Sequence, residues 1–434
     1  MKLKYLFLLF PFLAWSQHLD FNKLDSLQKT GKDIKVGLVL SGGGAKGLAH
    51  IGVLKVIEEA GIKIDYIGGT SMGAIVGGLY ASGYTTQQLD SIFRTTNFET
   101  LIQDDLPRGS KSFNERRDSE RYVLKLPFDD FKIKFPSGLS RGQNIYNFYA
   151  QLLSHIKEKD FSKLPIPFLC IAANVETGEE VILDSGDLAT SLSASGAIPT
   201  LFSPVYIDGM MLTDGGVLNN FPVDEISSKG MDLIIGVDVQ DGLKDREELK
   251  SGLEILSQVN NFRTVVAAKE KKKKTDLYIK PDIKGFSVLS FDQGKKIIKN
   301  GLIAANEKKK SFQKIAEAQD EYITREPVLI KDSLAVGNIK IIGNKDFPRN
   351  YVTGKLKLNA FEKTSFKELN AGLNNLSATG RFQKINYTLS DNGKYRDLTL
   401  KIYENDQNTQ LKFGVHYDQL YKTSFLANVT HKSL

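Results

Sequence analysis

Two glycine-rich turns decide the fold of this chain: Gly42-Gly43-Gly44-Ala45-Lys46-Gly47 and Gly69-Thr70-Ser71-Met72-Gly73. Each follows a short run of β-branched and apolar residues and precedes a helix-like run. The second turn fits G-x-S-x-G, the strand–turn–helix elbow that exposes a serine hydroxyl for attack on an ester. The first turn places consecutive backbone N–H groups at a helix N-terminus, where partial positive charge favours an anion. Together the two turns indicate acyl-transfer chemistry.

Short apolar runs alternate with amphipathic segments around these turns, from Ile34 to about Ala318. The runs expected to form buried strands are 35–40, 64–67, 167–173, 181–183 and 233–239. Helices are expected over 45–60, 72–80 and 86–93. Strands that alternate with helices predict an α/β domain with a mainly parallel sheet covered on both faces.

Ser71 is the expected nucleophile of this domain. Gly69 and Gly73 flank it, because a side chain at either position would collide with the neighbouring turn. The alternative is that Ser71 only caps the helix that follows it. The strand-like run before the turn and the small residues after it favour the elbow.

Asp214 is the expected general base. Gly215 and Gly216 follow it and let the backbone turn so that the carboxylate points into a cleft. A carboxylate in contact with Ser71 would accept the hydroxyl proton during attack and return it to the leaving alcohol. The alternative is an aspartate that bonds its own turn, a role that fits Asp208 of the Asp208-Gly209 hairpin signature better.

Histidine is the other residue type that could activate a serine. His50 follows Lys46 by one helical turn, so a Ser-His-Asp triad that uses it stays open. The remaining histidines do not lie in the loop context that a base usually occupies: His18, His155, His416 and His431. Because no His, Asp or Glu cluster has ligand spacing, neither a metal nor another cofactor is expected.

The whole chain has 434 residues, which predicts two or three domains. Its formal net charge of +7 is a mild excess that fits approach to anionic phosphate surfaces. No apolar run is long enough to cross a membrane as a helix. Cys170 is the single cysteine, so no disulfide forms within the chain.

The N-terminus carries the pattern of a secretory signal. Lys2 and Lys4 precede the apolar stretch 6–14, and small residues follow at the cleavage spacing. We therefore expect residues 1–16 to be a signal peptide, cut before Gln17, that directs secretion across the inner membrane.

The pattern of apolar and polar residues changes in the C-terminal part of the chain. Residues 330–405 combine strand-like runs at 338–342, 385–389 and 398–402 with helical stretches, which predicts a small α+β domain. From Thr409 two segments alternate apolar and polar residues, as the strands of a membrane barrel do. Two strands cannot close a barrel. Either the given chain stops short of its natural end, or the hairpin packs on something else.

The three motifs, in this order, resemble the patatin-like phospholipase family over roughly residues 34–318: the glycine loop, the elbow around Ser71, and Asp214-Gly215-Gly216. The resemblance implies a three-layer α/β/α fold and a Ser71–Asp214 dyad that hydrolyses acyl esters, usually of phospholipids. It also implies an oxyanion hole made by loop amides, with Gly42, Gly43 and Gly44 as its members. Lys46 stands where the family carries arginine or lysine and would steady the loop, with Gly47 completing the motif.

The module at 330–405 resembles a POTRA domain, because Ile339-Lys340-Ile341-Ile342-Gly343-Asn344 is similar to its first strand and turn. Residues 409–434 look like the first strands of an outer-membrane barrel, truncated here. The order of signal, patatin-like domain, POTRA domain and barrel resembles that of autotransported bacterial patatin-like phospholipases. This order implies a location in the periplasm or at the outer membrane or cell surface.

These resemblances imply a serine acyl-ester hydrolase of the phospholipase A type. Its expected partners are a phospholipid or other acyl-ester substrate and a membrane surface; nucleic acid is not expected, and a homodimer stays open. One alternative is a polypeptide-binding or secretion module of the POTRA-barrel type that carries the hydrolase as a passenger. Another is a general lipase or esterase with the same dyad.

Overall fold

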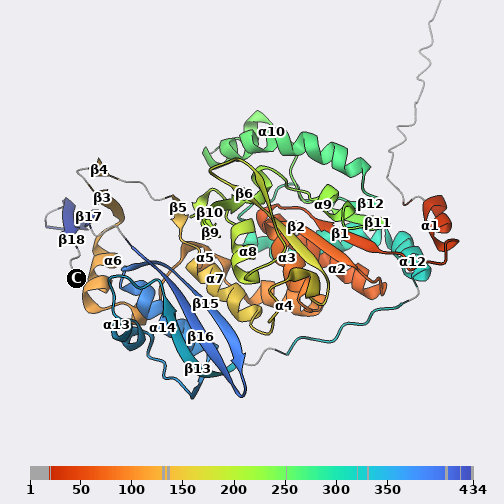
Figure 1. Ribbon diagram of the computed structural model, residues 1–434. Helices are drawn as coiled ribbons and strands as arrows, with labels where there is room; N and C mark the ends of the chain where they lie inside the picture. The colour runs from red at the N-terminus through yellow and green to blue at the C-terminus, as the bar shows by residue number, and fades with distance from the viewer. Residues whose placement is uncertain are drawn as a thin grey trace, which may run out of the picture.

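The computed structural model describes residues 19, 21–129, 132–133, 137–250, 252–319, 321–329, 332–405, 409–420 and 422–431. The expected signal peptide lies outside the described residues. The described chain forms an α/β unit, a small α+β unit and a C-terminal hairpin (Figure 1). Over these residues, no helix is both long enough and apolar enough to span a bilayer.

An eight-stranded sheet forms the centre of the α/β unit, in the order β12-β11-β1-β2-β6-β10-β9 with β7 beside β6. The strands are β1 (Val36–Leu40), β2 (Tyr66–Thr70), β6 (Phe168–Asn174), β7 (Glu180–Leu183), β9 (Val205–Ile207), β10 (Met210–Asp214), β11 (Leu233–Val237) and β12 (Leu277–Ile279). Strands β12, β11, β1, β2 and β6 pair in parallel. Strands β7, β10 and β9 join in antiparallel pairs. The predicted α/β class with a mainly parallel sheet is confirmed.

Both faces of this sheet are buried by helices. The first face packs on α2 (Ala49–Glu59), α3 (Met72–Ala81) and α8 (Leu188–Ser195), and the second on α9 (Val223–Ser227). Along β1, Leu38 and Leu40 belong to the first core cluster and Val39 to the second, as the alternation of strand side chains requires. This arrangement confirms the three-layer prediction.

Two predicted elements differ from those observed. The helix expected over 45–60 begins as a 3₁₀ turn (Gly44–Leu48) before α2. The strand expected over 64–67 is observed as β2 over 66–70, with Gly68 inside it, where a Cβ would lie 2.5 Å from Ile226 Cγ1 of α9. Gly69, which the sequence assigned to the turn, therefore belongs to the regular strand.

The remaining helices of this unit surround the central layers. They are α1 (Phe21–Gln28), α4 (Thr86–Thr95), α5 (Phe98–Gln103), α6 (Phe113–Arg121), α7 (Gln143–Leu152), α10 (Gly252–Lys273), α11 (Gly294–Asn306) and α12 (Lys309–Ala318). Two short strands, β5 (Gly138–Ser140) and β8 (Thr200–Phe202), pair beside α7. The long helix α10 lies across one side of the unit (Figure 1).

The small α+β unit has a four-stranded sheet in the order β14-β13-β16-β15. Its elements are β13 (Ser333–Ile342), α13 (Arg349–Leu356), β14 (Glu362–Ser365), α14 (Phe366–Ala378), β15 (Phe382–Asn392) and β16 (Tyr395–Glu404). The three strand-like runs expected from the sequence lie within β13, β15 and β16. Strand β15 is at the edge of the sheet.

Helix α7 holds this edge strand through side chains. Gln143 Nε2 donates to Ile385 O at 2.7 Å, and Ile385 N donates back to Gln143 Oε1 at 2.8 Å. Tyr146 Oη donates to Tyr387 O at 2.8 Å and accepts from Tyr387 N at 3.1 Å. All four side chains are buried, so these bonds satisfy backbone groups that would otherwise be orphaned between the two units.

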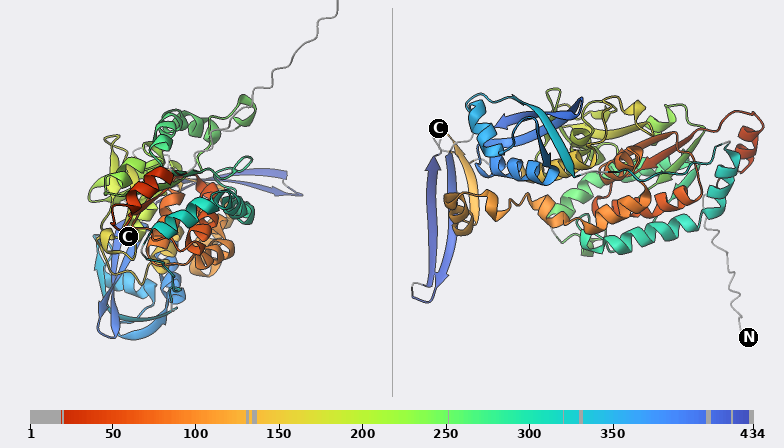
Figure 2. Two further views of the ribbon diagram at one scale, coloured as in Figure 1. Left: turned by 90° about the vertical axis from the view of Figure 1, so that its right-hand side faces the viewer. Right: turned by 90° about the horizontal axis from the view of Figure 1, so that it is seen from below.

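The C-terminal hairpin consists of β17 (Thr409–Asp418) and β18 (Lys422–His431). Strand β17 also pairs with β3 (Leu124–Asp129) of the α/β unit, which in turn pairs with β4 (Lys132–Ile133). Figure 2 shows the hairpin projecting at the end of the molecule away from α1. The hairpin is therefore paired with another part of the described chain through β3.

Candidate active site

Ser71 lies at a sharp turn between β2 and α3. Its backbone has φ 54° and ψ −125°, a strained conformation for a residue with a side chain. The turn leaves no room beside it: a Cβ at Gly73 would lie 2.2 Å from Leu40 O, and one at Gly69 would lie 2.6 Å from Ala74 N. This local crowding explains why glycine stands on both sides of the serine.

The Ser71 side chain contacts Asp214, although 143 positions separate the two residues. Ser71 Oγ donates to Asp214 Oδ2 at 2.6 Å. The second carboxylate oxygen, Oδ1, accepts from Gly216 N at 2.7 Å. Gly215 lets the chain turn against β6, since a Cβ there would lie 2.3 Å from Ile171 O. The strand end of β10 thus aims the carboxylate at the serine.

Burial changes the acidity of Asp214. The side chain is only 6% exposed, and loss of solvation raises its pKa from the usual 3.8 to about 6. The hydrogen bonds from Ser71 and Gly216 oppose this rise because they stabilise the carboxylate. The group is therefore ionised at neutral pH, yet it is a much better proton acceptor than an exposed aspartate.

The glycine loop lies beside the serine, and its amides have different roles. Gly42 N donates to Asn220 O at 3.1 Å, and Asn220 Nδ2 donates to Gly42 O at 3.3 Å. The Gly42 amide is thus already bonded in this arrangement, and its part in the oxyanion hole stays a prediction. Among the described residues, no acceptor is paired with the N–H of Gly43 or Gly44, and Gly44 lines the same hollows as Ser71.

Lys46 is buried under this loop and forms an ion pair with Asp241. Burial lowers the pKa of Lys46, and the charge of Asp241 opposes that change. Gly47 lies against the helix after the elbow, since a Cβ there would lie 2.4 Å from Met72 Cγ. The loop and the elbow are therefore packed as one piece.

Three residues that the sequence did not single out support the site. Ser195 Oγ accepts from Ser71 N at 3.0 Å and donates to Ile171 O at 2.6 Å. Asn219 O accepts from Thr70 Oγ1 at 2.9 Å, and Asn220 bonds the glycine loop as described. A serine in a small-residue helix and two asparagines in a loop carry no distinctive spacing, so only the folded arrangement reveals them.

His50 and His155 bond groups other than Ser71 in the described chain. His50 Nε2 bonds Ser41 O at 2.8 Å, and burial lowers the pKa of His50 to about 4. His155 bonds Ser82 O and Leu152 O at the end of α7. The His50 triad is thus absent from this arrangement, and Asp214 is the group in contact with the nucleophile.

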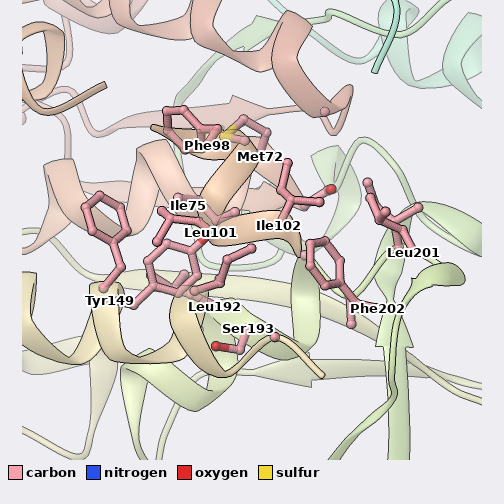
Figure 3. A pocket seen from close by; sticks show the side chains of 18 of the residues that line it. Met72, Ile75, Phe98, Leu101, Ile102, Tyr149, Leu192, Ser193, Leu201 and Phe202 are labelled. Carbon is pink, nitrogen blue, oxygen red and sulfur yellow. The ribbon is translucent and has the colours of Figure 1, made fainter. Parts of the chain in front are cut away.

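Ser71 lies where two hollows meet. The first is an apolar cavity (Figure 3), lined by Met72, Ile75, Phe98, Leu101, Ile102, Tyr149, Leu192, Leu201 and Phe202. The second is a polar cleft, lined by the glycine loop, Lys46, Asp214 and Gln240. Within the part of the chain that the structure describes, no three His, Cys, Asp or Glu side chains gather as a metal site. The arrangement suits an ester that places its apolar part in the cavity and its polar part in the cleft, with the ester bond at Ser71.

Comparison with family models covers most of the chain in three parts. Residues 38–226 match the family described as patatin-like phospholipase, and this range contains both Ser71 and Asp214. Residues 334–405 match the POTRA family described as surface antigen variable number repeat. Residues 396–434 match the OMP85 superfamily.

Curated relatives are much longer than this chain. A patatin-like phospholipase domain-containing protein of Caenorhabditis elegans is 31% identical over 312 residues, which are 65% of this chain and 21% of the relative. Lysophospholipase NTE1 of Candida albicans is 28% identical over 299 residues, 63% of this chain and 20% of the relative. The chain thus spans about a fifth of the length of these relatives.

Solved structures match more distantly. VipD from Legionella pneumophila aligns with a TM-score of 0.33 and 15% identity, covering 64% of this chain and 67% of that one. Human GIVD cytosolic phospholipase A2 aligns with a TM-score of 0.30 and 11% identity, covering 70% and 61%. From the three family matches, the chain carries a patatin-like phospholipase domain followed by a POTRA domain and a segment of the OMP85 superfamily.

Proposed function

We propose that the protein is a serine acyl-ester hydrolase of the phospholipase A type, with Ser71 as nucleophile and Asp214 as general base. The observation that carries this proposal is the 2.6 Å hydrogen bond from Ser71 Oγ to Asp214 Oδ2 at a strained, buried elbow. Strained backbone at a reactive side chain is typical of active sites. The match to the patatin-like phospholipase family supports the same function.

Acylation begins when Ser71 Oγ attacks the ester carbonyl carbon and Asp214 Oδ2 takes the hydroxyl proton. The amides of Gly43 and Gly44 receive the oxyanion that develops, and the loss of one such donor typically lowers turnover by about 10²–10³. Asp214 then gives the proton to the leaving alcohol oxygen as the carbon–oxygen bond breaks. Water next attacks the acyl-serine, Asp214 takes its proton and returns it to Ser71, and the fatty acid leaves.

The two hollows support a lipid as substrate. The apolar cavity accepts the acyl chain, and the polar cleft accepts the alcohol side of the ester. Phospholipid as the substrate is consistent with the family of the domain. The POTRA and OMP85 segments suggest association with the periplasm or outer membrane. We further propose that a signal peptide at residues 1–16 directs the protein across the inner membrane. The protein would then act at a membrane surface, as a homodimer.

The POTRA domain has a second candidate role, the capture of polypeptide by strand addition. In this structure Gln143 and Tyr146 already bond the edge of β15. This occupancy does not favour strand addition at β15, so the hydrolase is the better supported function.

Release of free fatty acid from defined phospholipid vesicles tests the proposal, with triglyceride and short-chain esters assayed alongside to separate phospholipase from general lipase. Ser71→Ala and Asp214→Asn should each lose nearly all activity. Asp208→Asn is the matched control, because Asp208 lies in the neighbouring exposed turn at φ 49°, a conformation that asparagine tolerates. Full activity in either site variant would overturn the assignment.

A further inference from the structure

The POTRA domain contributes a side chain to the cavity that contains Ser71. Lys384 of β15 lines this apolar cavity together with Arg141, which lies just before α7. The bonds between Gln143 and Ile385 fix the strand one residue away from Lys384. Arg141 Nη1 also donates to a β15 carbonyl, that of Phe382, at 3.1 Å. Lys384 is therefore held at the cavity by the docking of the two domains.

The same two cations also line a cleft between the domains. This interdomain cleft has a volume of about 540 Å³, within the range of roughly 300–1,000 Å³ that is typical of ligand sites. Arg141, Ser203, Val205 and Lys384 line both the cleft and the apolar cavity, so the two spaces adjoin at these residues. Lys125 adds a third cation, and among the described residues that line the two spaces there is no Asp or Glu. The charged side chains described at this junction are thus all cations.

Lys384 lacks a close counter-ion. Within the described chain no carboxylate lies within 4 Å of its ammonium, and the ring of Tyr146 lies near it, with the centroid at 5.9 Å. The acidic side chains that act on it through space are Asp104 and Asp187, whose carboxylates instead cap α7 and α8. Loss of solvation lowers the pKa of Lys384 to about 8. An anion bound here would supply the missing charge.

We propose that Lys384 and Arg141 form an anion subsite that binds the phosphate of an anionic glycerophospholipid, with a chain of the same lipid in the apolar cavity. The subsite deepens the proposed hydrolase function and rests on it, because it selects which lipids reach Ser71. It also gives the POTRA domain a part in substrate recognition. A hydrogen bond to a charged group contributes about 1.5–3 kcal/mol, which corresponds to at least tenfold in affinity.

Calorimetric binding tests this subsite independently of hydrolysis. The protein is the full chain with Ser71→Ala, and the ligands are monomeric dihexanoyl phosphatidylglycerol, dihexanoyl phosphatidylcholine and inorganic phosphate. Lys384→Met removes the charge and keeps most of the stem, and Lys384→Arg restores the charge. Lys340→Met is the matched control, because Lys340 is exposed on β13 of the same sheet, away from the cleft.

The Ser71→Ala chain should bind both phospholipids, because each carries the phosphodiester anion, and phosphatidylglycerol more tightly, because Lys384 and Arg141 repel the choline cation of phosphatidylcholine. Lys384→Met should weaken the binding of phosphatidylglycerol about tenfold or more, Lys384→Arg should retain it, and Lys340→Met should leave it unchanged. An unchanged affinity for phosphatidylglycerol in Lys384→Met would overturn the proposal. Inorganic phosphate that binds as tightly as the lipid, with the same dependence on Lys384, would also overturn it in favour of a free-phosphate site. If the native chain hydrolyses no ester, the proposed function fails while these binding results still decide the subsite.

Discussion

Replacement of Asp214 by Asn is expected to remove hydrolysis and to stabilise the folded protein at neutral and alkaline pH. The carboxylate of Asp214 is buried, with Ser71 Oγ and Gly216 N as its partners. An asparagine of the same shape can keep the bond from Gly216 and can donate to Ser71 Oγ instead of accepting from it. The substitution thus removes the buried charge and keeps the packing.

The magnitude follows from the pKa of Asp214, which burial raises from 3.8 to about 6 in the folded protein. Between these two pH values the folded state binds more protons than the unfolded state, so the free energy of unfolding falls as pH rises. At about 1.4 kcal/mol per pH unit, the full penalty above pH 6 is about 3 kcal/mol. Below about pH 4 the carboxyl is neutral in both states and the penalty vanishes.

Thermal unfolding of the native and Asp214→Asn chains, recorded from pH 4 to pH 8, checks this reasoning. For a domain of roughly 285 residues, about 3 kcal/mol corresponds to a rise in Tm of about 5 °C. The rise should appear above pH 6 and disappear near pH 4, and Asp208→Asn should show neither change. A Tm difference that is the same at pH 4 and pH 8, or a variant that is less stable at pH 8, would refute the argument from buried charge.

Three further outcomes follow from the site and the domain contact. Because Asp214 must be ionised to accept the proton, kcat/KM should fall about tenfold per pH unit below about pH 6, and a profile flat to pH 4 would contradict its role. Ser195→Ala leaves Ser71 N without its partner, so kcat should fall about tenfold with a smaller change in KM; equal kcat in both proteins would contradict the positioning role. Gln143→Leu leaves the backbone of Ile385 unpaired, which should cost about 1–3 kcal/mol and speed amide hydrogen exchange at Ile385, whereas native exchange would argue against the docking.

The parts of the fold that were predictable from the sequence are those set by local sterics and short-range pattern. The hairpin at Asp208 and Gly209 was predicted from its turn residues, and β9 and β10 flank it as expected. The elbow at Ser71 was predicted because only glycine fits on either side of so tight a turn. In both cases a short run of residues carries a recognisable pattern, although the strand β1 also crowds the elbow at Gly73.

Apart from the contact of Ser71 with Asp214, which the motifs implied, contacts between distant parts of the chain were not predictable. Nothing near Leu124 indicates that β3 pairs with β17, because its partner Phe413 lies almost three hundred residues away. Ser195 supports Ser71 through a single side-chain bond that has no sequence pattern. The hydrogen bond from Gly42 N to Asn220 O likewise depends on how two loops that are distant in sequence pack together. Such contacts depend on tertiary packing, which a pattern of residue types does not specify.

The hydrogen bonds between α7 and β15 make lipid binding and polypeptide capture mutually exclusive. An incoming polypeptide strand would need the backbone groups of Ile385 and Tyr387, which side chains of α7 hold. Such a strand would have to separate the two domains, and Lys384 would then no longer line the cavity. By thermodynamic reciprocity, a lipid bound between the domains would lower the affinity for the strand by the same factor as the strand lowers the affinity for the lipid. One molecule could then do either job, but never both at once.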